Sequence, residues 1–175
     1  IMQAGGGNIF ESEPMFNDHA MLEMLQEIEG IRSVSRVAYY PGIFQSRGDS
    51  VKFTLANGRD TFRLQQEIRG VMFKGVDTDF DLSFFEDNLF EGRLLDFSDT
   101  ASAFEILVSK KIANQMQFKV GDRIPVFFVH DQPFRRNFNV VGIFETGLDD
   151  FDGELALAKL TTVQNVSGWG IQSSI

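Results

Sequence analysis

Aspartates at regular spacing are the first residues in this sequence that could bind a metal. Asp77, Asp79 and Asp81 stand at the first, third and fifth positions of a potential calcium loop. Such a loop needs glycine at position six for its sharp turn and a bidentate glutamate at position twelve. The chain has Leu82 and Asn88 at those positions, so the pattern does not predict a calcium site.

The remaining candidates for chemistry are one acidic run and two histidines. The run at 149–154 lacks the same glycine and closing ligand, and we expect a solvated turn before a strand. His19 and His130 each stand alone, and a hydrolase would need the fold to bring one of them to a carboxylate in a cleft. We therefore predict no catalytic residue, no metal and no cofactor, and we do not expect an enzyme.

Composition removes several other classes of function. The 175 residues include no cysteine, which excludes disulfides and thiolate chemistry, and the sequence has no nucleophile elbow, phosphate loop or dinucleotide fingerprint. The 25 acidic and 16 basic residues give a net charge of −9, which argues against a nucleic-acid partner. Apolar stretches have only strand length, whereas a membrane helix needs about 20 residues. We read both ends, Ile1 and Ile175, as cuts in a longer chain.

Phenylalanine is the conspicuous residue, with 19 copies. Most should lie in the core, because each buries about 150–250 Å². Phe134 is the exception, since it falls at a predicted hairpin tip beside Arg135 and Arg136. An aromatic ring with two guanidinium groups on an exposed turn is a candidate contact for a partner protein or an apolar ligand. A solvated tip is an equally good interpretation of the same three residues.

The first half of the chain is predicted to hold one helix and several strands. A helix over 18–29 begins at the N-cap Asn17 and ends at Gly30, and its apolar side must pack on a sheet or another helix. A strand over 31–40 should break or bend at Pro41 and Gly42. Further strands are expected at the following ranges: 50–55, 62–64 and 68–74.

The second half alternates helices with strands. A short irregular or helical segment is expected over 77–92, and Ser109 should cap a helix over 110–117 that follows a buried strand at 106–108. Pro125 indicates an edge position for its strand. The other expected elements are a hairpin of strands 123–130 and 135–144, a strand near 154–158 and a helix over 161–166. The predicted class is α+β.

Several segments, in this order and spacing, resemble the extracytoplasmic domain of MacB-type ABC permeases. The segments are 31–34, 71–77, 90–93, 106–109, 119–124 and 138–144. Within that superfamily, residues 144–152 and the helix at 161–166 look most like the lipoprotein-releasing LolC/LolE permeases and their FtsX-like relatives. The resemblance implies a porter-like α/β part interrupted by a mostly β sabre part. By analogy, residues 1–75 form the first porter half, 76–169 the sabre, and 170–175 a truncated return towards the porter.

The resemblance also implies a function. It predicts a periplasmic domain of a bacterial inner-membrane permease that couples ATP hydrolysis by a partner ATPase subunit to substrate release or export, with lipoprotein as the expected substrate. A second permease subunit, and a lipoprotein or its periplasmic chaperone, are the other implied partners. In LolC-like members a long loop of the 123–144 hairpin recruits that chaperone, but here the tip is short. The alternative is an independent soluble binding or adaptor domain without catalytic activity.

Overall fold

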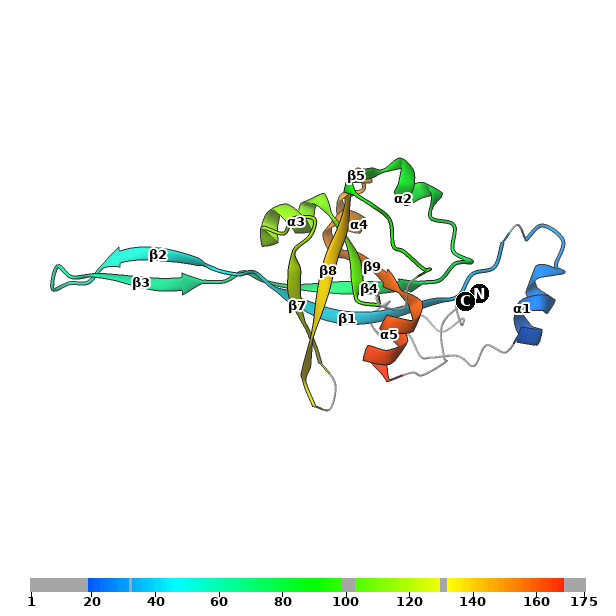
Figure 1. Cartoon of the computed structure of the whole chain (residues 1–175), viewed down its shortest axis with the longest axis horizontal. Coiled ribbons are helices and arrows are strands. Elements are labelled where there is room, and N and C mark those ends of the chain that lie inside the picture. The colour runs from blue at the N-terminus through cyan, green and yellow to red at the C-terminus, as the bar shows by residue number, and fades with distance from the viewer. Residues whose placement is uncertain (1–18, 32, 99–102, 130–131, 169–175) are drawn as a thin grey trace.

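A computed structural model describes residues 19–31, 33–98, 103–129 and 132–168 (Figure 1). In chain order its elements are α1 (His19–Gln26), β1 (Val37–Gln45), β2 (Asp49–Thr54), β3 (Asp60–Gln65), β4 (Ile68–Val76), α2 (Ser83–Asp87), β5 (Leu89–Gly92), β6 (Glu105–Ser109), α3 (Lys110–Met116), β7 (Arg123–Phe128), β8 (Phe134–Phe144), α4 (Asp149–Glu154), β9 (Leu155–Lys159) and α5 (Leu160–Ser167). The mixture of helices and strands agrees with the α+β prediction at that level. The division at 75 and at 169 stays a prediction.

Seven strands form one mixed sheet that closes on itself. Their order is β5-β8-β6-β9-β4-β1-β7, and β7 also pairs with β8. The pairs β4–β9 and β6–β8 are parallel and the others are antiparallel. Strands from both sides of residue 75 therefore share one hydrogen-bonded ring, and β5 pairs with the C-terminal end of β8.

Each face of this sheet has its own apolar cluster. Phe44, Phe73, Phe128 and Phe138 belong to the inner cluster, where their ring centroids lie 5.3–6.1 Å apart in four contacts. Helices α3 and α5 contribute to the same cluster. The outer cluster combines sheet residues such as Phe144 with Phe85 of α2 and with other side chains before β6. Most of the described phenylalanines thus belong to the core, as expected. They are divided between two clusters on opposite faces of one sheet.

Pro41 and Gly42 lie inside β1, so the prediction that they break the strand is wrong. All nine β1 residues pair with β4, whereas β7 pairs with β1 only at Ile43 and Phe44. Proline is tolerated in a strand where one edge has no ladder partner. A Cβ on Gly42 would lie 2.6 Å from Cε2 of Phe73. Gly42 is therefore a packing residue that makes room for the central phenylalanine.

The edge position expected for the strand around Pro125 is also wrong, because β7 has a partner strand on each of its edges. β7 pairs with β8 along 123–128 and with β1 at two positions, which closes the ring. Pro125 pairs with Asn137 of β8 and lies outside the short β1–β7 ladder. Pro125 therefore marks only its own position, because the other edge of β7 is open at Pro125 and pairs with β1 from the next residue, Val126.

Helix α1 lies apart from the sheet, contrary to the packing expected from its apolar side (Figure 1). It ends at Gln26, earlier than predicted, and of its expected apolar side Ile28 is 50% exposed and Leu25 is half-buried. A separate connector joins it to β1, so no sheet face reaches these side chains. Its expected cap, Asn17, lies outside the described residues. No helix in the described ranges combines the length and apolarity needed to cross a membrane.

The remaining strands and helices follow the sequence expectations closely. Strands β2, β3, β4, β6 and β9, the β7–β8 hairpin, and helices α3 and α5 occur at the predicted places, with ends shifted by a few residues. Ser109 caps α3, because its Oγ accepts a hydrogen bond from the Ile112 amide at 3.1 Å. The segment predicted to be irregular or helical contains the short helix α2 and the strand β5.

Strands β2 and β3 form a separate two-stranded sheet that projects from the body, and we call residues 49–65 the arm (Figure 1). The arm continues β1 and β4. Hydrogen bonds and an ion pair hold its root, residues 46–47 and 66–67, in place. The Ser46 amide donates to the Glu67 carbonyl at 2.9 Å, and Ser46 Oγ accepts from the Glu67 amide at 2.8 Å. Arg47 forms an ion pair with Asp122 at 2.8 Å. These contacts direct the arm away from the closed sheet.

Candidate functional site

The predicted contact residues lie at the free end of the β7–β8 hairpin. Phe134 is the first residue of β8, pairs with Phe128 of β7, and packs its ring 5.5 Å from the Phe128 ring. It is half-buried and joins the rim of the inner cluster. The buried body of the sheet therefore holds the Phe134 ring in place from one side and leaves the other side accessible.

The two arginines of the predicted trio are separated by the strand. Side chains alternate between the faces of a strand, so Arg136 shares the face of Phe134, and Arg135 points to the opposite face. The Arg136 guanidinium lies 5.1 Å from the centre of the Phe134 ring, and its Nη1 donates to the Arg135 carbonyl at 3.1 Å. The structure brings Phe134 and Arg136 together and leaves Arg135 apart from them.

An open groove of about 660 Å³ lies beside Phe134. It is formed by the start of β8, the segment before β6, and the C-terminal end of α5. The residues that line it are Phe104, Gln132, Phe134, Arg136, Asn165, Val166 and Gly168. Two aromatic rings and a valine offer an apolar surface, and Arg136 offers a cation at its rim. Such a groove could accept an apolar side chain that is followed by a carboxylate.

Phe104 is the groove residue that the sequence reasoning placed in the core. Its ring stands edge-on to Phe138 at 5.5 Å, yet it is 39% exposed. The Phe104 carbonyl accepts from the Asn139 amide at 2.8 Å, where β6 and β8 begin to pair in parallel. Only a prediction of that parallel pairing could have placed Phe104 near Phe134, because 30 residues separate them in the chain.

An ion pair between a buried carboxylate and a half-exposed guanidinium lies next to Phe104 in the chain. Glu105, which follows Phe104, is 5% exposed and binds the Arg93 guanidinium through both carboxylate oxygens. Its Oε2 also accepts from the Asp96 amide at 3.1 Å. The hydrogen bond to Glu105 raises the pKa of Arg93 above its ordinary value. The pair fastens the segment after β5 to the start of β6.

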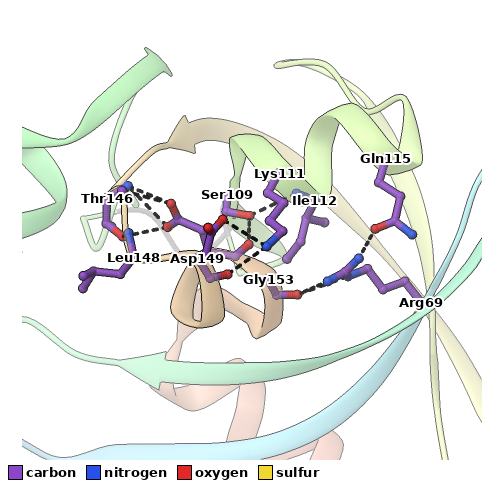
Figure 2. Close-up of polar contacts among 11 residues, drawn as sticks. Arg69, Ser109, Lys111, Ile112, Gln115, Thr146, Leu148, Asp149 and Gly153 are labelled. Atoms are coloured by element: carbon purple, nitrogen blue, oxygen red, sulfur yellow. Dashed lines mark hydrogen bonds and ion pairs between the residues drawn. The ribbon is translucent and has the colours of Figure 1, made fainter.

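A second polar network joins α3, α4 and β4 (Figure 2). The Asp152 carboxylate accepts from Thr146 Oγ1 at 2.8 Å and from the amides of Thr146 and Gly147 at 3.1 and 3.2 Å. Ser109 Oγ donates to the Asp152 carbonyl. The acidic run at 149–154 is therefore the helix α4 with a buried aspartate, and the solvated turn predicted there is wrong.

The same network extends to the root of the arm (Figure 2). Arg69 of β4 donates from Nε to the Gly153 carbonyl at 3.1 Å and from its guanidinium to Gln115 of α3. Lys111 of α3 pairs with Asp149 at 3.2 Å. Every side chain of the network bonds to a neighbouring loop or helix. We interpret it as a structural clamp, with the arm root as one of its attachment points.

The aspartates of the 77–81 run make local contacts. Asp77 forms an ion pair with Arg36 at 2.7 Å, and Asp81 accepts from the Ser83 amide at 2.9 Å. Within the described ranges, no three metal-ligating side chains gather at one point. His130 and the side chain of His19 lie outside the described residues, so the hydrolase hypothesis stays open at that level.

Comparison with known proteins shows that this chain shares its fold with one solved structure. The sequence matches no protein-family model and no curated protein. Among solved structures, the chain is similar to the extracellular domain of the noncanonic ABC-type transporter YknZ from Gram-positive bacteria. The two agree with a TM-score of 0.53 and 15% identity over 87% of this chain and 67% of that one. The predicted resemblance to an ABC-permease domain is supported at the level of fold, and the closer likeness to LolC/LolE stays a prediction.

Proposed function

We propose that this chain is the extracytoplasmic domain of an ABC-transporter permease in a bacterial inner membrane. The observation that carries the proposal is the fold shared with the YknZ extracellular domain over 87% of the chain. The order of the sequence segments described above points to the same class of protein. In this function the chain performs no catalysis. A separate ATPase subunit hydrolyses ATP, and the membrane helices of the permease pass the resulting motion to this domain.

Release or export of a lipoprotein is the proposed task. In that task the hairpin tip contacts the lipoprotein or its periplasmic chaperone through Phe134, Arg135 and Arg136. The support for this step is the groove, where Phe134 offers an apolar ring and Arg136 a cation at the rim. Arg135, on the other face of β8, would meet a partner that is large enough to wrap round the hairpin. A second permease subunit completes the proposed transporter.

Cysteine labelling tests the proposed location, because these 175 residues contain no cysteine. Asn114→Cys places a thiol on an exposed position of α3, and Val163→Cys places one at a buried position of α5. In cells with an intact cytoplasmic membrane and a permeabilised outer barrier, a membrane-impermeant maleimide should label the first variant. It should label the buried control only after denaturation. Labelling of Asn114→Cys only after the cytoplasmic membrane is lysed would contradict the proposal.

Co-purification tests the coupling to ATP hydrolysis. A tag on the full-length protein should recover an ABC ATPase from detergent-solubilised membranes, with ATPase activity in the recovered complex. Recovery from the soluble fraction without an ATPase would favour the independent adaptor domain.

Alanine substitution tests the hairpin tip. Alanine at positions 134, 135 and 136 together should lower partner affinity and transport by tenfold or more, about 1.4 kcal/mol. Alanine at the exposed Arg123, at the far end of β7, is the matched control.

A further inference from the structure

The arm has one face that combines exposed apolar side chains with an unpaired cation. The register pairs Val51 with Arg63 and Phe53 with Thr61, so these four side chains share a face. Val51 and Phe53 are 42% and 41% exposed. Within the described residues, the structure gives Arg63 no ion pair. We call Val51, Phe53 and Arg63 the docking face.

The opposite face of the arm is arranged differently. There Lys52 pairs with Asp60 at 2.7 Å, and Thr54 Oγ1 donates to Asp60 at 2.9 Å. Phe62 lies on that face and is 67% exposed. The charges of this face are therefore satisfied within the arm, while the docking face keeps a cation available for a partner.

Among the described residues, the two strands of the arm have no third strand and no helix packed against them. An isolated two-stranded hairpin is only marginally stable in water, and both of its edges present unpaired backbone groups. The fastened root directs the arm away from the described part of the body (Figure 1), which therefore leaves the docking face uncovered. A second molecule is able to cover it.

The charge balance identifies the kind of molecule that fits. Residues 49–65 carry three basic and two acidic side chains, whereas the rest of the chain carries 13 basic and 23 acidic ones. The arm is thus the basic part of an acidic protein. The acidic body of another copy of the same chain is therefore its electrostatic complement.

One surface of the body matches the docking face, because it combines an exposed aromatic ring with acidic side chains. Phe84 of α2 is 45% exposed, and Asp87 lies three residues later on the same side of the helix. Asp79 precedes them in the turn that leads into α2. No cation among the described residues pairs with Asp79 or Asp87. We call Asp79, Phe84 and Asp87 the α2 surface.

We propose that the docking face of the arm binds the α2 surface of a second copy of this chain. Phe53 packs against Phe84, and Arg63 pairs with Asp87. The arm projects from one side of the body, and α2 lies on the body itself beside β5 (Figure 1), so a two-fold pair allows each copy to place its arm on the other. This pairing is independent of the proposed transport function, because it rests only on the surfaces of the chain itself.

Sedimentation of the 175-residue chain over a concentration series tests the pairing. The wild type should form a dimer. Phe53→Ser should raise the dissociation constant at least tenfold, because a buried aromatic residue is a typical anchor of an interface. Phe62→Ser is the matched control on the opposite face and should change it less than about threefold. Both residues are exposed, so equal thermal unfolding midpoints verify that the variants fold.

Charge reversal tests the partner surface. Arg63→Glu alone and Asp87→Arg alone should each weaken the dimer at least tenfold, through like-charge contacts. The two changes in one chain should restore the wild-type constant within about threefold, because each arm then meets a basic α2 surface. A chain that is monomeric at all concentrations overturns the proposal. A dimer that is insensitive to Phe53→Ser, or a double variant that does not regain affinity, overturns it as well.

Discussion

The closed sheet and the arm share one pair of strands, because β1 and β4 continue as β2 and β3. The arm strands alternate apolar with polar residues, whereas β4 has three consecutive buried apolar residues at 71–73. In the sheet, Phe44 and Phe73 are fully buried, whereas Phe62 in the arm is 67% exposed. The contrast teaches that a strand pattern says which side chains share a face, while the number of packed layers decides whether that face is buried.

The largest expected effect is the loss of the central phenylalanine of the sheet. Phe73 is fully buried and contacts the rings of Phe44, Phe128 and Phe138. Phe73→Ala should lower the free energy of unfolding by about 3–5 kcal/mol, because it leaves a cavity. Phe62→Ala in the arm should change it by less than about 0.5 kcal/mol. Urea unfolding measures both, and equal losses would mean that the arm is as well packed as the sheet.

A smaller effect is expected from adding one methyl group to the sheet. Gly42→Ala places a Cβ 2.6 Å from Cε2 of Phe73 and 3.2 Å from Cε1 of Phe128. The resulting overpacking should lower the free energy of unfolding by about 1–3 kcal/mol. Gly70→Ala, in β4 near the arm root, meets no atom within 4 Å and should be close to neutral. Thermal unfolding with a known enthalpy distinguishes the two, and a neutral Gly42→Ala would refute the packing role.

The cap of α3 offers a test at about 1 kcal/mol. Ser109→Ala removes the hydrogen bond from the Ile112 amide and the bond that Ser109 donates to the Asp152 carbonyl. Loss of an N-cap of this kind costs about 0.5–2 kcal/mol. Ser50→Ala, on the exposed arm, is the control and should stay within about 0.5 kcal/mol. Denaturant unfolding of both variants should show a difference in favour of the arm substitution.

The smallest effect concerns an ion pair of the arm itself. Hydrogen bonds from Lys52 and then Thr54 lower the pKa of Asp60 below its ordinary value of 3.8. A lowered folded-state pKa means that the Asp60 carboxylate adds stability above its unfolded pKa and loses it as the pH falls through the folded one. Lys52→Met should therefore raise the pKa of Asp60 in a carbon-detected NMR titration. Arg63→Met, on the other face, should leave it unchanged.

Local elements were well predicted, and the reasons are visible in particular residues. Ser109 was identified as a cap because serine before a helical apolar pattern accepts an amide hydrogen bond. The β7–β8 hairpin followed from alternation on both sides of a polar turn. By contrast, the sequence predicts a break or bend at Gly42, since sequence alone does not show that the ring of Phe73 lies over it.

The candidate site was predicted in part. The trio at 134–136 was placed at a hairpin tip, and the tip is there, but only Phe134 and Arg136 share a face. Phe104 and Val166 complete the groove from other elements. Their contribution depends on the parallel pairing of β6 with β8 and on the position of α5. No spacing in the sequence encodes either of these.

The sequence by itself determined the kinds of elements, their order, and the absence of thiol chemistry, because periodicity, caps and composition act over a few residues. Its segment order also pointed to the transporter-domain fold. The tertiary structure decided that the sheet closes on itself, that Pro41 and Gly42 belong inside a strand, and that residues 49–65 stand free as an arm. These features depend on contacts between residues that are distant in the chain, and such contacts exist only after the layers have packed.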